Sequence, residues 1–121
     1  MIPRLLASQL LRSAGQFPVV TVTGPRQSGK TTLCRAVFPD KPWVSLEDPD
    51  QRRFAIEDPR GFLQVWRDGA IFDEFQNVPE LPSYLQGMVD ADPAPGRFIL
   101  TGSQHFALMN RVSQSLAGRT A

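Results

Sequence analysis

Residues Gly24-Pro25-Arg26-Gln27-Ser28-Gly29-Lys30-Thr31 follow the pattern G-x-x-x-x-G-K-T. The two glycines allow successive backbone N–H groups to turn into one concavity, which binds an anion at the start of a helix. Lys30 can reach the β- and γ-phosphates of a nucleotide as a point charge, and the Thr31 hydroxyl can ligate Mg²⁺. This stretch therefore predicts a phosphate-binding loop.

The sequence on either side of the loop supports this interpretation over a chance glycine-rich turn. Residues 19–23 read Val-Val-Thr-Val-Thr, a β-branched run that is typical of a buried parallel strand. Residues 30–37 read as a helix that begins at the end of the loop. A strand, a loop and a helix in this order place the backbone N–H groups where phosphate binding requires them.

Composition limits the class of protein. A chain of 121 residues is one domain, and it is small for a complete nucleotide-hydrolysing fold. The net charge of +1, from 13 basic and 12 acidic residues, gives no support for nucleic acid as a partner. Cys34 is the single cysteine, so we expect a buried thiol and no internal disulfide. No long apolar run predicts a membrane span, and we expect a reducing cytoplasm.

The rest of the chain alternates between helices and strands. Spacing and turn signals predict helices over 3–14, 30–37, 50–57 (capped by Asp50), 59–66, 82–89 and 104–117, and strands over 19–23, 43–46, 70–72 and 97–101. Alternation of this kind predicts an α/β fold with a parallel sheet and right-handed crossovers. Ligands of such sheets bind at the carboxyl ends of the strands.

An acidic pair follows the strand predicted over 70–72. Asp73 and Glu74 would be costly to bury at a strand end without a purpose. We expect Asp73 to hold the hydration shell of Mg²⁺ opposite Thr31, and Glu74 to polarise the water that attacks the γ-phosphate. The alternative is an ordinary acidic turn at the end of a strand.

Thr101-Gly102-Ser103 ends the strand predicted over 97–101. A hydroxyl at this place can hydrogen-bond the attacking water or the γ-phosphate, which would make it a sensor of the nucleotide. In the alternative, Ser103 is the N-cap of the next helix. The sequence does not choose between Thr101 and Ser103.

Six segments together resemble the N-terminal ATPase core of the prokaryotic AAA-type ATP-binding proteins that carry a C-terminal domain of unknown function. They are Arg4-Leu5-Leu6, the loop from Thr23 to Thr32, Ser45 to Pro49, Phe72 to Leu81, Phe98 to Ser103 and Ser115 to Arg119. The resemblance implies a three-layer P-loop NTPase with strand order 5-1-4-3-2. It implies ATP as the nucleotide, Mg²⁺ as the metal and residues 24–32 as the nucleotide-binding segment. It also places Arg119 where an arginine can contact phosphates, in the same chain or in a neighbour, although a solvated arginine is the alternative.

Three further residues have two interpretations each. Asp48 lies either near the metal or in a turn before Pro49. Gln76 either orients Glu74 or is a surface loop amide, and we favour the latter. Arg4 and the leucine-rich first helix either cover the adenine or serve only to pack leucines into the core.

The function that we expect is a Mg²⁺-dependent ATPase core that hydrolyses ATP to ADP and phosphate and thereby drives or gates a partner domain. A nucleotide-dependent switch that binds without turnover is the alternative. A small-molecule kinase ranks last, because the acidic pair favours water as the nucleophile and no lid or acceptor cleft is identifiable.

The chain stops at Ala121, before the fifth strand that the resemblance implies. We expect this to leave an unpaired strand edge beside residues 19–23. Either self-association or a C-terminal domain then covers this edge, or the chain is only marginally stable. Sedimentation should then show association, or a melt should show low stability. A monodisperse monomer with a cooperative melt at high temperature would contradict the expectation.

Overall fold

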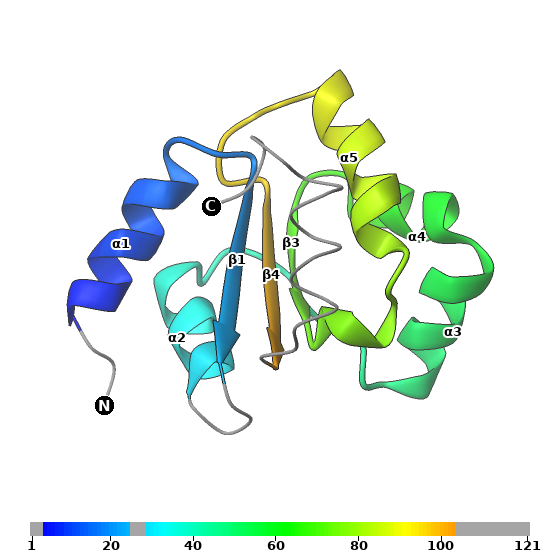
Figure 1. The fold of residues 1–121 in the computed structure, drawn as a ribbon, viewed down its shortest axis with the longest axis horizontal. Coiled ribbons are helices and arrows are strands. Elements are labelled where there is room, and N and C mark those ends of the chain that lie inside the picture. The colour runs from blue at the N-terminus through cyan, green and yellow to red at the C-terminus, as the bar shows by residue number, and fades with distance from the viewer. Residues whose placement is uncertain (1–3, 25–28, 104–121) are drawn as a thin grey trace.

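The computed structural model describes residues 4–24 and 29–103, which form a central sheet with helices on both faces (Figure 1). The elements in chain order are α1 (Arg4–Ala14), β1 (Val19–Gly24), α2 (Lys30–Val37), β2 (Trp43–Ser45), α3 (Pro49–Glu57), α4 (Pro59–Val65), β3 (Ala70–Asp73), the 3₁₀ helix η1 (Phe75–Asn77), α5 (Leu81–Ala91) and β4 (Phe98–Ser103).

The four strands lie in the order β1-β4-β3-β2, and every neighbouring pair is parallel. This confirms the α/β class and the 1-4-3-2 part of the predicted order. Among residues 4–24 and 29–103 the sheet ends at β1 on one side and at β2 on the other. The helix predicted over 104–117 lies outside the described residues.

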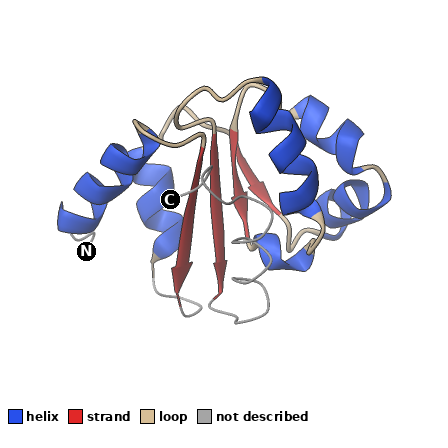
Figure 2. Cartoon of the chain, turned by 45° about the horizontal axis from the view of Figure 1, so that its top comes forward, coloured by secondary structure: helices blue, strands red, loops and turns tan. Residues whose placement is uncertain are grey.

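Helices cover the two faces of the sheet as separate layers. In Figure 2, α1 and α2 lie on one side of the strands and α3, α4 and α5 lie on the other. Each layer has its own apolar cluster, one built around Leu33 and Ile99 and the other around Phe62 and Phe72. The result is the three-layer architecture that a parallel sheet needs to bury both faces.

The larger cluster is built on a row of phenylalanine rings. Phe62 of α4 lies 5.4 Å from Phe72 of β3, centroid to centroid, and Phe72 lies 5.6 Å from Phe98 of β4. Because side chains alternate along a strand, Ile71 and Ile99 project to the opposite face and pack with Leu33 and Cys34. Together, β3 and β4 therefore hold both helical layers in place.

The start of α3 differs from the prediction. Asp50 was expected to cap this helix, but the N-cap is Asp48, whose Oδ1 accepts a hydrogen bond from Asp50 N at 3.3 Å. Pro49 is then the first helical residue, a position that suits its fixed φ and missing N–H. The prediction for Asp50 is wrong, and Asp48 has the turn-stabilising contact that was one of its two interpretations.

Two shorter differences lie near the carboxyl ends of the strands. Strand β2 ends at Ser45, one residue earlier than expected, although Leu46 is still buried and its N–H donates to Asp73 O at 2.9 Å. The 3₁₀ helix η1 directly after the acidic pair was not predicted.

Candidate nucleotide-binding site

The predicted site residues meet at the carboxyl ends of β1, β3 and β4. Strand register pairs Val22 of β1 with Thr101 of β4, and Phe72 of β3 with Leu100 of β4. Asp73 follows Phe72 and therefore lies beside Thr101. Figure 1 shows these ends on the same side of the molecule as the start of α2.

The start of α2 has the backbone that the loop requires. Gly29 is the N-cap, with φ of 84°, in the left-handed region that only glycine adopts without strain. A Cβ at this position would meet no atom of the described residues within 4 Å, and the positive φ itself favours glycine here. Gly24 ends β1, and Pro25, Arg26, Gln27 and Ser28 lie outside the described residues.

Asp73 joins three segments of the site through one oxygen. Its Oδ1 accepts a hydrogen bond from Thr31 Oγ1 at 2.7 Å and another from Thr101 Oγ1 at 2.5 Å. Asp73 is 7% exposed and Thr101 is completely buried. The two hydroxyls satisfy a buried carboxylate that would otherwise be costly to desolvate.

Glu74 contacts a different residue of α2. Its Oε1 lies 3.4 Å from Lys30 Nζ, and both side chains are buried, at 9% and 6% exposure. The Glu74 backbone has φ of 56°, the single positive φ among the described non-glycine residues. Asn77 holds this turn, because its Nδ2 donates to Glu74 O at 3.0 Å.

Gln76 corrects the sequence prediction. It was expected to be a surface loop amide, but it is half-buried and its Nε2 donates a hydrogen bond to Glu74 Oε2. The sequence signal was its spacing of two residues from Glu74, which is short enough for contact only if the chain turns sharply between them. That turn is the left-handed residue Glu74 followed by η1.

Of the remaining predicted residues, some are described by the structure and others are not. Thr32 is exposed on α2 and, with Thr31, lines a cavity of about 510 Å³ that extends along α2 to Lys41 and Trp43. Ser103 belongs to β4, but its side chain is not described, and Arg119 lies outside the described residues. In α1, Leu10 packs with Leu33 and Cys34. The Arg4 side chain lies outside the described part of the structure, and its contact with the adenine stays a prediction.

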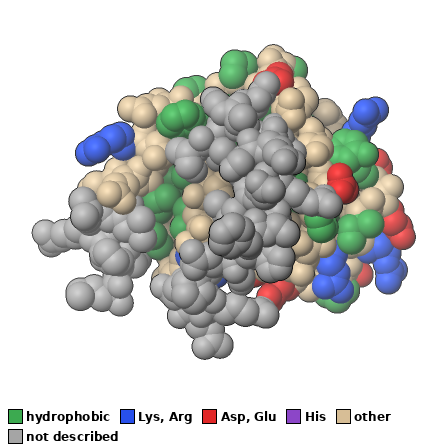
Figure 3. All heavy atoms as spheres, in the orientation of Figure 1, with side chains coloured by type: hydrophobic (Ala, Val, Ile, Leu, Met, Phe, Trp, Pro, Cys, Tyr) green, Lys and Arg blue, Asp and Glu red, His purple; other side chains and the backbone are tan. Residues whose placement is uncertain are grey.

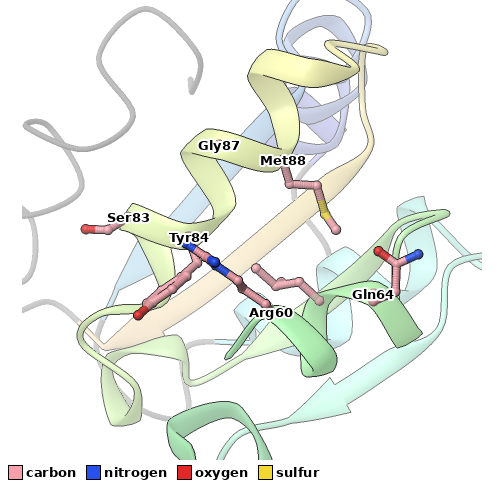
Figure 4. Close-up of a pocket in the computed structure, with 7 residues that line it drawn as sticks. Arg60, Gln64, Ser83, Tyr84, Gly87 and Met88 are labelled. Carbon is pink, nitrogen blue, oxygen red and sulfur yellow. The ribbon is translucent and has the colours of Figure 1, made fainter. Parts of the chain in front are cut away.

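A second cavity, of about 410 Å³, lies between α4 and α5 and contains none of the predicted site residues. Figure 4 shows Arg60 and Gln64 of α4 and Ser83, Tyr84 and Met88 of α5 along it. The Arg60 guanidinium lies 5.8 Å from the centroid of the Tyr84 ring. This cavity is therefore separate from the cluster around Asp73.

Charge on the visible surface is mixed. Figure 3 shows Lys and Arg side chains interspersed with Asp and Glu at the side of the molecule where α3 lies. No helix in the described part of the chain is both long enough and apolar enough to cross a membrane.

The chain is similar to known proteins over most of its length. A family model described as an AAA domain matches residues 16–121. Uncharacterized proteins from Mycobacterium bovis and Mycobacterium tuberculosis are each 40% identical over 116 residues, covering 93% of this chain. The chain spans 26% of the length of these curated relatives.

The parallel sheet, the glycine-capped α2 and the polar residues at the strand ends define the chain as an α/β domain of the P-loop NTPase class. The chain belongs to the AAA domain family. Membership indicates a nucleotide-binding domain of the ATPase-like type.

Cys34 provides a test of the packing behind the site. Burial first, and the charge of Asp73 second, raise the pKa of its thiol from 9.0 to about 12. The higher pKa keeps the thiol protonated, so at pH 8 the thiolate fraction falls roughly a thousandfold. We expect a thiol reagent to label the folded chain far more slowly than the chain in urea. Equal labelling rates would contradict the buried position.

Proposed function

We propose that the chain is a Mg²⁺-dependent ATPase core that hydrolyses ATP to ADP and phosphate to drive or gate a partner domain. One observation carries the proposal. The acidic pair at the end of β3 contacts the two residues of α2 to which the loop motif gives a chemical role, with Asp73 on Thr31 and Glu74 on Lys30. An ordinary acidic turn would have no reason to be buried against both.

In this proposal the loop and α2 bind the phosphates. The N-terminus of α2 presents backbone N–H groups and the positive end of the helix dipole to an anion. Lys30 then exchanges Glu74 for the β- and γ-phosphates, so its charge stays compensated. ATP is the proposed nucleotide because the AAA domain family is ATPase-like.

Thr31 and Asp73 fit Mg²⁺. Both offer hard oxygen ligands, and Thr31 Oγ1 lies 2.7 Å from Asp73 Oδ1. Among the described residues no group of three or more His, Cys, Asp or Glu could hold a metal ion. Mg²⁺ at nucleotide sites commonly uses only one or two protein carboxylates and takes its other ligands from water and phosphates. The ion would neutralise charge on the phosphates.

Glu74 is the proposed general base. Its carboxylate accepts a proton from water while the water oxygen forms a bond to the γ-phosphorus. The bond from the γ-phosphorus to the bridging oxygen breaks, and ADP leaves with the electron pair. Thr101 or Ser103 would contact the water or the γ-phosphate, and Arg119 would contribute charge. Thr101 is supported by its hydrogen bond to Asp73.

We also propose a cytoplasmic location and a partner at the β1 edge of the described sheet, either a second copy or further chain of the kind that the longer relatives carry. A nucleotide-dependent switch is the alternative function. The ion pair between Lys30 and Glu74 supports the switch as much as the ATPase, because nucleotide binding without hydrolysis would already break that pair.

Substitution of Lys30 tests nucleotide binding. A charged contact to phosphate is worth about 2 kcal/mol, so Lys30→Ala should raise the Kd for Mg·ATP about 30-fold or more in calorimetry. Lys41→Ala is the matched control, since Lys41 is the only other lysine and its Nζ donates to Arg97 O. Unchanged affinity in Lys30→Ala would remove the central claim.

Substitution of Glu74 separates the ATPase from the switch. Glu74→Gln keeps the shape of the side chain but cannot accept the proton, so kcat should fall by about 10²–10⁴-fold while ATP binding remains. Phosphate release by the unmodified protein and by the variant gives the comparison. If the unmodified protein binds ATP but shows no turnover in any assembly state, the switch is the function.

A further inference from the structure

The two oxygens of the Glu74 carboxylate have different partners. Oε1 lies 3.4 Å from Lys30 Nζ, and Oε2 accepts a hydrogen bond from Gln76 Nε2. Lys30 belongs to α2 and is the residue expected to meet the phosphates. Gln76 belongs to η1, on the same turn as Glu74 itself. One contact is therefore available for exchange with a nucleotide, whereas the other is internal to the turn.

The orientation of the Gln76 amide is determined by Glu74. Its Oε1 is buried and has no hydrogen-bond partner within the described part of the chain, which carries a free-energy penalty. The opposite orientation would place Oε1 against the Glu74 carboxylate, where two acceptors repel. The amide thus keeps a hydrogen bond to Glu74 at the expense of an unsatisfied oxygen.

Gly102 of β4 makes room for this arrangement. A Cβ at Gly102 would lie 2.7 Å from Gln76 Oε1 and 2.9 Å from Phe75 Cε1. The Gln76 amide therefore lies directly against the backbone of β4, next to Thr101. Contact with the sheet on one side and with Glu74 on the other leaves the amide little freedom.

The turn that carries Gln76 is held by contacts that do not involve Lys30. Phe75 is fully buried, and both the backbone N–H and the Nδ2 of Asn77 donate to Glu74 O, at 3.2 and 3.0 Å. Removal of Lys30 from Glu74 by a phosphate would leave these contacts in place. The hydrogen bond from Gln76 to Oε2 would also remain and would hold this oxygen of the carboxylate.

We infer that Gln76 is a positioning residue for Glu74, an inference that rests on the proposed ATPase function. Gln76 holds Oε2, and Oε1, which faces Lys30, accepts the proton of water once Lys30 has turned to the phosphates. Gln76 itself contacts neither nucleotide nor water in this role, so it acts on the rate of the chemical step and not on nucleotide affinity.

The test is Gln76→Met, which keeps the length and packing of the side chain but cannot donate a hydrogen bond. We expect kcat for ATP to fall about 10- to 100-fold, with the Kd for a non-hydrolysable ATP analogue unchanged within about twofold. Gln76→Glu, which places a like charge beside Glu74, should lower kcat at least as much. Gln64→Met on the exposed face of α4 is the matched control and should change neither constant.

A double variant distinguishes positioning from a general loss of structure. In a Glu74→Gln background, Gln76→Met should lower the residual rate by less than about twofold, because the group that it positions is already gone. A further 10-fold loss in that background, or a parallel loss of nucleotide affinity, would overturn the inference.

Failure of the inference and failure of the proposed function give different results. If the unmodified protein hydrolyses ATP and Glu74→Gln does not, but Gln76→Met matches the unmodified protein, the inference alone is wrong. If the unmodified protein shows no turnover and Glu74→Gln changes nothing, the proposed function is wrong and the inference falls with it.

Discussion

Much of the site depends on one oxygen atom, Asp73 Oδ1, which accepts hydrogen bonds from Thr31 and Thr101. A buried carboxylate is tolerated only when such donors satisfy it. The donors come from α2 and β4, while Asp73 ends β3, so the interaction forms only if all three segments converge. It fixes the start of α2 against the sheet, and the charge of the same carboxylate contributes to the raised pKa of Cys34 on the next turn of α2.

Neighbouring residues in the sequence have separate chemical surroundings in this site. In a continuing strand, Asp73 and Glu74 would project to opposite faces of the sheet. The left-handed backbone at Glu74, with φ of 56°, ends the strand and turns the chain into η1. Glu74 thereby reaches Lys30 while Asp73 reaches Thr31, so the two carboxylates contact successive residues of the same helix.

Local sequence was sufficient for the strands and most of the polar cluster, whereas the strand order came from the family resemblance. Asp73, Thr31 and Thr101 were predictable as neighbours because parallel strands end at the same edge of a sheet, and the glycine pattern located α2. The contact between Gln76 and Glu74 was not predictable. It depends on a backbone conformation that glutamate rarely adopts, and no propensity argument assigns that conformation to this residue. The cap of α3 was misassigned for a smaller reason, since both Asp48 and Asp50 are good cap residues and only the position of Pro49 separates them.

The left-handed backbone at Glu74 also affects which amino acids are favoured at position 74. Glycine or asparagine would relieve backbone strain of about 1 kcal/mol or more at this position. Either residue would also remove the carboxylate from the buried Lys30 ammonium, a loss that costs more than the strain. At position 74 the backbone conformation and the side-chain contacts therefore favour different amino acids. A relative with glycine or asparagine at this position would lose both side-chain contacts of Glu74, the one to Lys30 and the one to Gln76.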